Sequence, residues 1–388
     1  MSSLALFNVG RIISGDLDRA LVEADTVLVE DGVFTKIGSR AEIDAAAADV
    51  RIDVKGATLA PGLIDTHVHI VLGDWTPRQN ALGFIESYMH GGVTGMMSAG
   101  EIHLPGVPQD PVGVKALAIV AHKAYERFRP GGVKVYAGSV LFQPGLSEAD
   151  FKEMSEAGVW LGKVGFGNFK KPTDAEPLVR IAQRYGFKVM CHTGGASIPG
   201  SAPVTADDLM VIQPDISAHT NGGTTALPDE GVERLVRQAK FSLQICQAGN
   251  IRSAIYLMKL ARDNDQLRRI LIASDTPSGT GVMPMATIKS VVEMSALVGL
   301  PAAQVWAMAS GNAADALGLN TGGIEVGKAA DLVVIDAPLG CSRPDAVAAI
   351  ENGDIPGISC VIIDGEIRAM KSRNTPASTR MAEVVSKN

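Results

Sequence analysis

The middle of the chain alternates apolar, strand-like runs with helical stretches, and this alternation constrains the fold more than any other feature. Repeated strand–helix units are typical of a parallel sheet. The strand candidates are Leu63–Ile70, Val93–Ser98, Val133–Leu141, Val159–Gly165, Phe187–His192, Ile216–His219, Phe241–Cys246 and Ile270–Ser274. The helix candidates between them include Pro111–Phe128, Ser147–Glu156, Ala175–Tyr185, Asp229–Arg237 and Ile251–Asp263. Roughly eight strands in about 250 residues predict an α/β fold of the (β/α)8 TIM-like barrel type.

A doubly wound sheet is the alternative architecture. Such a sheet usually carries a glycine-rich phosphate loop after its first strand. This chain has His67-Val68-His69 at that place. The barrel is therefore the favoured prediction.

Both ends of the chain carry short β-like runs without the intervening helices. Asp31-Gly32 and Asp364-Gly365 stand between such runs and are typical of hairpin turns. The runs are Leu4–Val9, Thr26–Glu30, Val33–Ile37 and Arg51–Val54 at one end, and Ala330–Ile335, Ser359–Ile363 and Glu366–Met370 at the other. We therefore expect residues 1–60 and 319–388 to form one small β domain around a barrel of residues 61–318.

Composition excludes several classes of protein. Of 388 residues, 46% are apolar and 20% are charged, which is ordinary for a globular enzyme and not for a disordered chain. A net charge of −7 without a basic stripe argues against a nucleic-acid partner. The chain has neither an apolar run of membrane-spanning length nor a signal-peptide pattern, so no membrane partner is expected. The 4 cysteines lack CxxC spacing, which favours a reducing cytoplasm.

The segment Pro61-Gly-Leu-Ile-Asp-Thr-His-Val-His69 contains the strongest chemical signal. Residues two apart on a strand point to the same face, so His67 and His69 project side by side. Two convergent imidazoles at a strand end can hold a zinc-like ion. The alternative is two core histidines that each bond a backbone carbonyl, and each would then need its own buried partner.

Further polar residues close the other apolar runs. Catalytic groups of a (β/α)8 barrel lie at the carboxyl ends of its strands. The residues at these ends are His67, His69, Lys163, His192, His219 and Asp275. They are too many for one tetrahedral zinc, but they suit about two divalent ions that share a bridging ligand. Zinc is the first expectation, and iron or manganese would also accept these nitrogen and oxygen ligands.

Lys163 is the unusual member of this set, because an ammonium group would repel two cations. A buried lysine with a lowered pKa can be neutral, and a neutral amine can add carbon dioxide. The resulting carbamate would be an anionic bridge between two ions. The alternatives are a solvated lysine at a strand end or a salt-bridge partner.

Asp275 also has an alternative interpretation, in which its side chain caps the N-terminus of a helix and binds no metal.

The ordered set His-x-His, Lys, His, His, Asp resembles the amidohydrolase superfamily, with binuclear sites as in dihydroorotase and hydantoinase. The terminal β segments resemble its β-sandwich domain, so the resemblance covers nearly the whole chain. Within the superfamily, four stretches resemble the enamidases, which hydrolyse 6-oxotetrahydronicotinate. They are residues 73–79, 192–201, 275–281 and 353–359.

The resemblance implies hydrolysis of a cyclic amide, a lactam or enamide. The expected substrate is a small ring that bears a carboxylate, such as 6-oxotetrahydronicotinate. A hydroxide held between the two metals would attack the carbonyl carbon. Asp275 would take the hydroxide proton and deliver it to the leaving nitrogen. A small-molecule substrate and a homo-oligomeric enzyme are expected.

Loops after the predicted strands supply candidate substrate contacts. Arg78 could pair with a carboxylate, and His103 could polarise the scissile carbonyl. The Gly- and Ser-rich loop Thr193–Ser201 could form an anion-binding nest of backbone N–H groups. The tentative substrate-binding set is Arg78, His103, Thr193, Gly194, Gly195 and Ser278. The alternatives are a surface salt bridge, a loop histidine and a flexible loop.

Three rival functions remain open at this point. A hydrolase of cyclic ureides, similar to dihydropyrimidinase or dihydroorotase, is the nearest. A non-catalytic scaffold with the same fold is the second, but it would not need five metal-ligand residues together. A deaminase with a single metal is the third, and it would not require Lys163.

Overall fold

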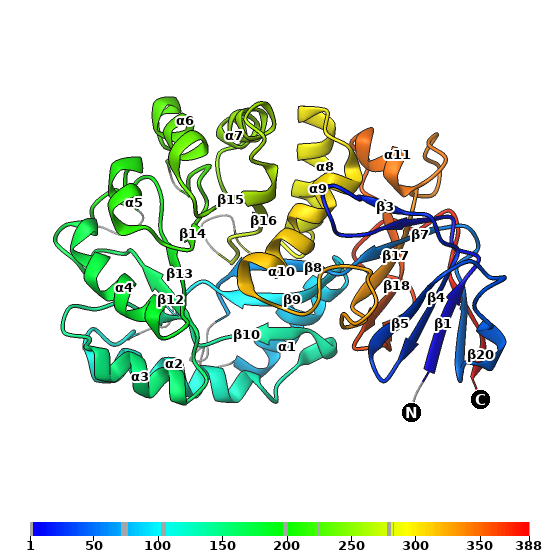
Figure 1. The fold of residues 1–388 in the computed structure, drawn as a ribbon, viewed down its shortest axis with the longest axis horizontal. Coiled ribbons are helices and arrows are strands. Elements are labelled where there is room, and N and C mark those ends of the chain that lie inside the picture. Colours follow the sequence, from blue (N-terminus) through cyan, green and yellow to red (C-terminus); the bar gives the residue numbers. More distant parts are fainter. Residues whose placement is uncertain are drawn as a thin grey trace.

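The computed structural model describes residues 3–70, 77–101, 106–196, 201–223, 225–277, 281 and 283–387. A helix-bearing α/β part and a part made of two β-sheets lie side by side, and both chain ends lie in the second part (Figure 1). Within the described residues, no helix is long and apolar enough to cross a membrane.

Parallel strands form the α/β part. One sheet has the order β10-β9-β8 and the other the order β11-β12-β13-β14-β15-β16. The strands are β8 (Leu63–Val68), β9 (Val93–Ser98), β10 (Lys134–Tyr136), β11 (Val140–Leu141), β12 (Leu161–Val164), β13 (Lys188–Cys191), β14 (Ile216–Ser217), β15 (Ser242–Cys246) and β16 (Ile270–Ala273). These strands and their connecting helices confirm the α/β class.

The first and last of these strands meet just beyond their carboxyl ends. A parallel bridge joins Val68 to Thr276, and the Asp275 N–H donates to the His67 carbonyl over 2.9 Å. The His69 N–H donates to the Thr276 carbonyl over 3.0 Å. Residues 67–69 and 275–276 are thus neighbours although about two hundred positions separate them in the chain.

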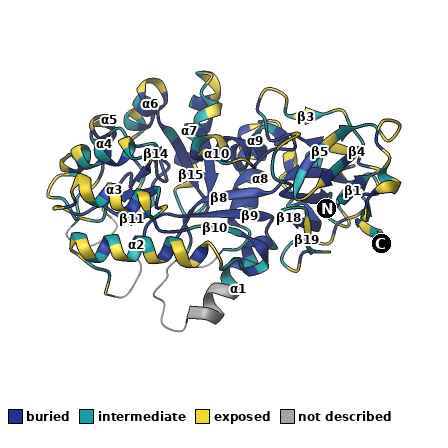
Figure 2. Cartoon of the chain, turned by 60° about the horizontal axis from the view of Figure 1, so that its bottom comes forward, coloured by how far each residue is buried: buried dark blue, intermediate teal, exposed yellow. Residues whose placement is uncertain are grey.

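Helices follow most of these strands and turn a buried face toward them, so that their exposed residues lie on the outside (Figure 2). Asp110 and Asn250 cap two of these helices, where their side chains accept the N–H of Gly113 and of Ser253. Such a cap stabilises a helix by about 1 kcal/mol. The helices are α1 (Pro77–Met89), α2 (Pro111–Tyr125), α3 (Glu148–Glu156), α4 (Glu176–Arg184), α5 (Ala206–Ile212), α6 (Asp229–Gln238), α7 (Ile251–Asp263), α8 (Ala286–Val298), α9 (Ala302–Met308), α10 (Gly311–Leu317) and α11 (Ala346–Glu351).

One predicted strand is wrong. The run Val133–Leu141 is divided into β10 and β11, which belong to different sheets. Gly138 lies between them with φ +87°, and a Cβ there would come within 2.5 Å of the Ala118 carbonyl oxygen. The chain therefore turns at a position that only glycine accepts easily.

The strands of the two chain ends form two sheets. The sheets share one hydrophobic cluster, to which Leu6 and Phe34 contribute from one sheet and Leu59 and Ile362 from the other. One sheet has the order β20-β6-β1-β4-β5, the other β19-β18-β17-β7-β2-β3. The strands are β1 (Ser3–Phe7), β2 (Arg11–Ile13), β3 (Leu21–Val22), β4 (Thr26–Glu30), β5 (Val33–Gly38), β6 (Val50–Asp53), β7 (Thr58–Pro61), β17 (Leu332–Asp336), β18 (Gly357–Ile363), β19 (Glu366–Ala369) and β20 (Glu383–Lys387).

The predicted hairpin turns are present. Asp31 and Gly32 have φ of 48° and 80° between β4 and β5, and these strands pair antiparallel. Positive φ at both central residues is the geometry that asparagine, aspartate and glycine favour in two-residue turns.

Candidate metal centre

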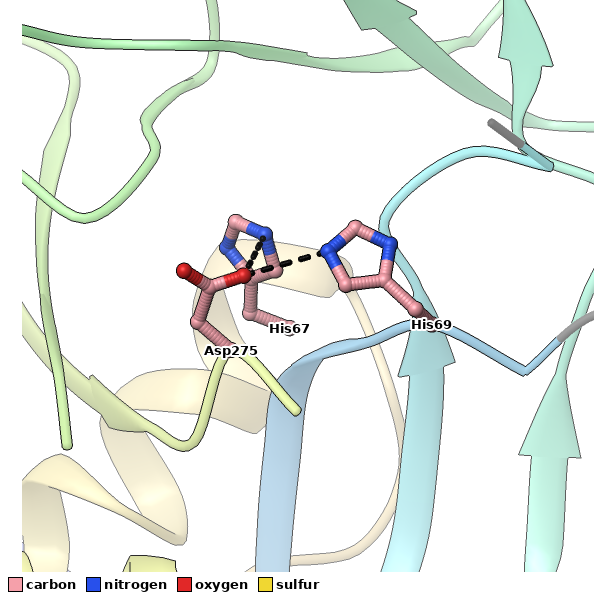
Figure 3. Close-up of side chains that lie close together, drawn as sticks. All are labelled: His67, His69 and Asp275. Carbon is pink, nitrogen blue, oxygen red and sulfur yellow. Dashed lines mark hydrogen bonds and ion pairs between the residues drawn. The ribbon is translucent and has the colours of Figure 1, made fainter. Parts of the chain in front are cut away.

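Three of the predicted ligands meet where β8 ends and β16 ends. The ligand atoms of His67, His69 and Asp275 lie within 4.8 Å of one another, and all three residues are buried. Asp275 Oδ1 is 3.1 Å from the Nε2 atom of His67 and 3.1 Å from that of His69 (Figure 3). The two imidazoles converge on one carboxylate oxygen, as the spacing of the histidines predicts.

The other two predicted histidines lie beside this group. The His219 ring centroid is 5.3 Å from that of His67 and 4.7 Å from that of His192. Burial lowers the pKa of His67 and of His192 to about 4, and Lys163 contributes to both shifts. Burial also holds the pKa of His219 well below its usual range, with His192 as the next cause. These imidazoles are therefore neutral near pH 7, which is the form that binds a metal.

Asp275 is ionised where the neighbouring histidines are neutral. Burial alone would raise the pKa of Asp275, but His67 and His69 outweigh it and hold that pKa well below its usual range. An ionised carboxylate surrounded by neutral imidazoles offers several lone pairs and little positive charge. Among the described residues, the buried Nδ1 of His219 has no hydrogen-bond partner. This donor set fits a divalent cation.

Two of these residues have a strained backbone. Asp275 has φ 57° and His219 has φ 29°, a region that residues other than glycine rarely adopt. Each lies directly beyond the end of a strand, where the turn points its side chain at the cluster. Strain of this kind persists where the surrounding structure imposes it, and it gathers at functional sites.

Lys163 is completely buried on β12. Its Nζ lies 3.3 Å from Met190 Sδ. Burial lowers the pKa of Lys163 to about 8. The Phe166 ring lies 5.8 Å from Nζ and 5.3 Å from the His192 ring, with Phe166 itself at φ 67°. Burial disfavours the ammonium form although the charge of Asp275 acts against this effect, so a neutral or modified amine is more accessible here than at an exposed lysine.

Comparison with known proteins shows the family of this chain. The enamidase of Eubacterium barkeri is 46% identical over 386 residues, which are 99% of this chain and all 100% of the relative. The chain belongs to the amidohydrolase family. Residues 207–368 match the amidohydrolase family description itself. The prediction of an amidohydrolase, a hydrolase of C–N bonds, is confirmed.

Two further similarities extend this result. The crystal structure of an enamidase superposes with a TM-score of 0.95 at 46% identity and covers 99% of this chain and 100% of that one. The imidazolonepropionase of Geobacillus kaustophilus is 24% identical over 378 residues, 83% of this chain and 86% of the relative.

The amidohydrolase site rests on a buried aspartate that the sequence analysis did not single out. Asp65 accepts hydrogen bonds from the backbone N–H of His67 and of Ser274, over 3.2 and 3.0 Å, and from the Thr287 hydroxyl over 3.0 Å. Burial raises the pKa of Asp65 to about 6, so an ionised carboxylate is costly there. Its three donors offset that cost and join β8 to β16.

Asp65→Ala is expected to lower the free energy of unfolding by roughly 2–4 kcal/mol, because three buried donors lose their acceptor. Urea denaturation followed by circular dichroism measures this loss. Thr287→Val is the matched control, since it removes only one of the three bonds and should cost about 1 kcal/mol. A smaller loss for Asp65→Ala than for Thr287→Val would contradict the supporting role.

The predicted substrate contacts have mixed outcomes. Thr193 Oγ1 lies 2.8 Å from Ser217 Oγ, in the protein interior. The Gly194 N–H donates to the Val204 carbonyl and the Gly195 N–H to the Thr225 carbonyl. These two N–H groups are therefore occupied, and the nest prediction is not supported at Gly194 and Gly195. His103, Ser278 and the side chain of Arg78 lie outside the described residues.

A second supporting residue, Gln244, was also missed. It lies inside the apolar run Phe241–Cys246, and its side chain is completely buried against His67. A polar residue in the interior of such a strand is a usable signal, because buried polar groups need partners.

Phe166, whose ring lies near Lys163 and His192, was missed as well. It follows its strand as many loop residues do, so the sequence gives no indication of these contacts.

Proposed function

We propose that this amidohydrolase opens a cyclic amide at a divalent-metal centre held by His67, His69, Lys163, His192, His219 and Asp275. The convergence of His67, His69 and Asp275 within 4.8 Å is the observation that carries the proposal. Full-length similarity to an enamidase supports the choice of substrate class. In this proposal residues 61–318 form a closed (β/α)8 barrel, and residues 1–60 and 319–388 form a β-sandwich domain.

The metal would supply Lewis acidity and a nucleophile that is available near neutral pH. About two ions are expected, with zinc as the first candidate and iron or manganese as alternatives. The neutral imidazoles would provide ligand nitrogens, and the ionised Asp275 would provide a ligand oxygen.

Asp275 would also act on protons. Its Oδ1 is already shared between two imidazole nitrogens at 3.1 Å, so its second oxygen, Oδ2, is the atom we assign to proton transfer. Asp275 would take a proton from the attacking water and return it to the ring nitrogen that leaves. This is general base catalysis followed by general acid catalysis by one group.

Lys163 would complete the centre as a carbamate. Its neutral Nζ would form a bond to the carbon of carbon dioxide and release one proton to solvent. The carbamate oxygens are anionic and could bridge two cations, whereas an ammonium would repel them. Complete burial and the lowered pKa of about 8 support this chemistry.

The proposed substrate is a small lactam ring bearing a carboxylate, such as 6-oxotetrahydronicotinate. With an enamide, hydrolysis would release an enamine, and its tautomer would hydrolyse further to an aldehyde and ammonia. Arg78 and His103 stay predictions for substrate contacts, as do a homo-oligomer and a cytoplasmic location. Cyclic ureides are the second candidate class.

The purified protein is expected to contain about two divalent ions per chain and to lose activity when they are chelated. Elemental analysis measures the ions, and a hydrolysis screen over lactams, hydantoins and dihydropyrimidines measures the activity. His67→Ala should lose metal and activity together.

Full activity after exhaustive chelation would refute the metal centre. A preference for uncharged hydantoins or dihydropyrimidines would instead move the protein to the ureide class, with the metal centre retained. The two results are therefore separable.

A further inference from the structure

We propose that Gln244 is a positioning residue that fixes the ring tautomer of His67 and the backbone of His219. The proposal rests on the metal centre of the proposed function and adds a residue that prepares its ligands. Gln244 lies on β15, between the strands that carry His219 and Asp275. Its side chain is 0% exposed.

Both ends of the Gln244 amide have partners. Oε1 lies 2.7 Å from His67 Nδ1 and 3.2 Å from the backbone nitrogen of His219. Nε2 lies 2.7 Å from the Thr66 hydroxyl and 3.3 Å from the Thr66 carbonyl oxygen. One side chain thereby joins β8, β14 and β15 directly beneath the metal ligands.

The chemistry of these partners fixes which way the amide points. The backbone N–H of His219 can only donate, so it requires the oxygen of the amide. The Thr66 carbonyl can only accept, so it requires the nitrogen. The two requirements agree, and a flipped amide would violate both of them.

A fixed amide in turn fixes the proton of His67. Oε1 can only accept, so His67 Nδ1 must carry the hydrogen, which leaves Nε2 with its lone pair. That lone pair faces Asp275 Oδ1 at 3.1 Å, which is a second acceptor. With the proton on Nδ1, His67 offers its Nε2 lone pair toward the same space as Asp275 Oδ1, where a divalent cation would accept electron pairs from both atoms. Gln244 therefore prepares His67 to bind a metal through Nε2.

The same oxygen also holds the strained turn at His219. The backbone of His219 has φ 29°, and its N–H donates to Gln244 Oε1. Loss of this acceptor would leave the buried N–H of His219 without a partner at a position whose backbone is strained. One substitution at Gln244 should therefore change the positions of both His67 and His219.

The test compares the Zn²⁺ affinity of variants at this position by competition with a chelating indicator. Gln244→Met keeps the length and removes the acceptor, so its affinity should fall roughly 10–100-fold. Gln244→Glu keeps an acceptor for both donors but places an oxygen against the Thr66 carbonyl, so its affinity should lie between that of the wild type and that of Gln244→Met. Gln244→Asn withdraws the acceptor by one methylene and should weaken binding as Gln244→Met does, which keeps the test usable if the methionine variant does not fold.

Gln247→Met is the matched control, because Gln247 directly follows β15 and its side chain accepts from the Ser290 hydroxyl over 2.6 Å. Among the described residues, this side chain makes no hydrogen bond to the proposed metal ligands. It should bind Zn²⁺ as the wild type does. An equal loss in Gln247→Met and Gln244→Met would assign the effect to general disturbance of β15 and overturn the proposal.

A second readout does not depend on metal at all. Nitrogen-15 NMR of the metal-free protein should show His67 as the Nδ1–H tautomer in the wild type and in Gln244→Glu, and as a mixture in Gln244→Met. A wild type that binds none of Zn²⁺, Fe²⁺ and Mn²⁺ would refute the proposed function, while the tautomer would still decide the role of Gln244. An unchanged tautomer together with unchanged affinity in Gln244→Met would overturn the proposal.

Discussion

Asp275→Asn is expected to lower kcat by roughly 10²–10⁴ while the fold is kept, the range typical of a lost general acid–base group. Asparagine has nearly the same size as aspartate, and its carbonyl oxygen can still approach His67 and His69. It cannot take up a proton and pass it on. Steady-state kinetics on the lactam substrate measures the effect, and circular dichroism checks the fold.

Asp265→Asn is the matched control for this experiment. Asp265 and Asp275 share a φ of 57°, so both substitutions place asparagine in the same left-handed backbone region. Asp265 is exposed after α7 and should keep wild-type kcat. If Asp275→Asn also kept wild-type kcat, the proton would have to move through another group.

Much of the α/β part is predictable because its signals are local. β9 and α7 have the predicted limits, Val93–Ser98 and Ile251–Asp263. Strand periodicity and helix caps lie within a few residues of the elements they define. Gly138 shows the limit of this approach. The residues around it have the pattern of one strand, and the contact with Ala118 that requires a turn there is not visible in the local sequence.

The residues of the candidate site also fall into a predictable and an unpredictable group. The histidines and Asp275 are predictable, because they close apolar runs and parallel strands end at one edge. Their supports are not, because each support acts across the sheet. Gln244 lies 177 positions from His67, and Asp65 lies 209 positions from Ser274. Periodicity identifies a buried polar residue on a strand but does not identify its partner.

Lys163→Ala is expected to abolish activity, and short carboxylic acids such as acetate or propionate should restore part of it. The reason is that the substitution removes the proposed carbamate bridge and leaves a buried space of about the same size. A free carboxylate can supply the same two oxygens to the cations. Activity measured against increasing acid concentration tests this, and carbon-13 NMR with labelled bicarbonate should show a carbamate carbon in the wild type alone.

Lys188→Ala is the control for lysine loss near the same sheet. Lys188 begins β13, the strand next to Lys163, and its Nζ lies 3.8 Å from the Asp215 carboxylate. This lysine has an anionic partner and solvent access, so its removal should leave kcat unchanged and acids should have no effect. Lys163 differs in its solvent access, since it is completely buried and burial lowers its pKa to about 8. Wild-type activity in Lys163→Ala would contradict the bridge, because the centre would then work without it. A carbamate signal that survives the substitution would place the carbamate on another amine and would contradict the bridge as well.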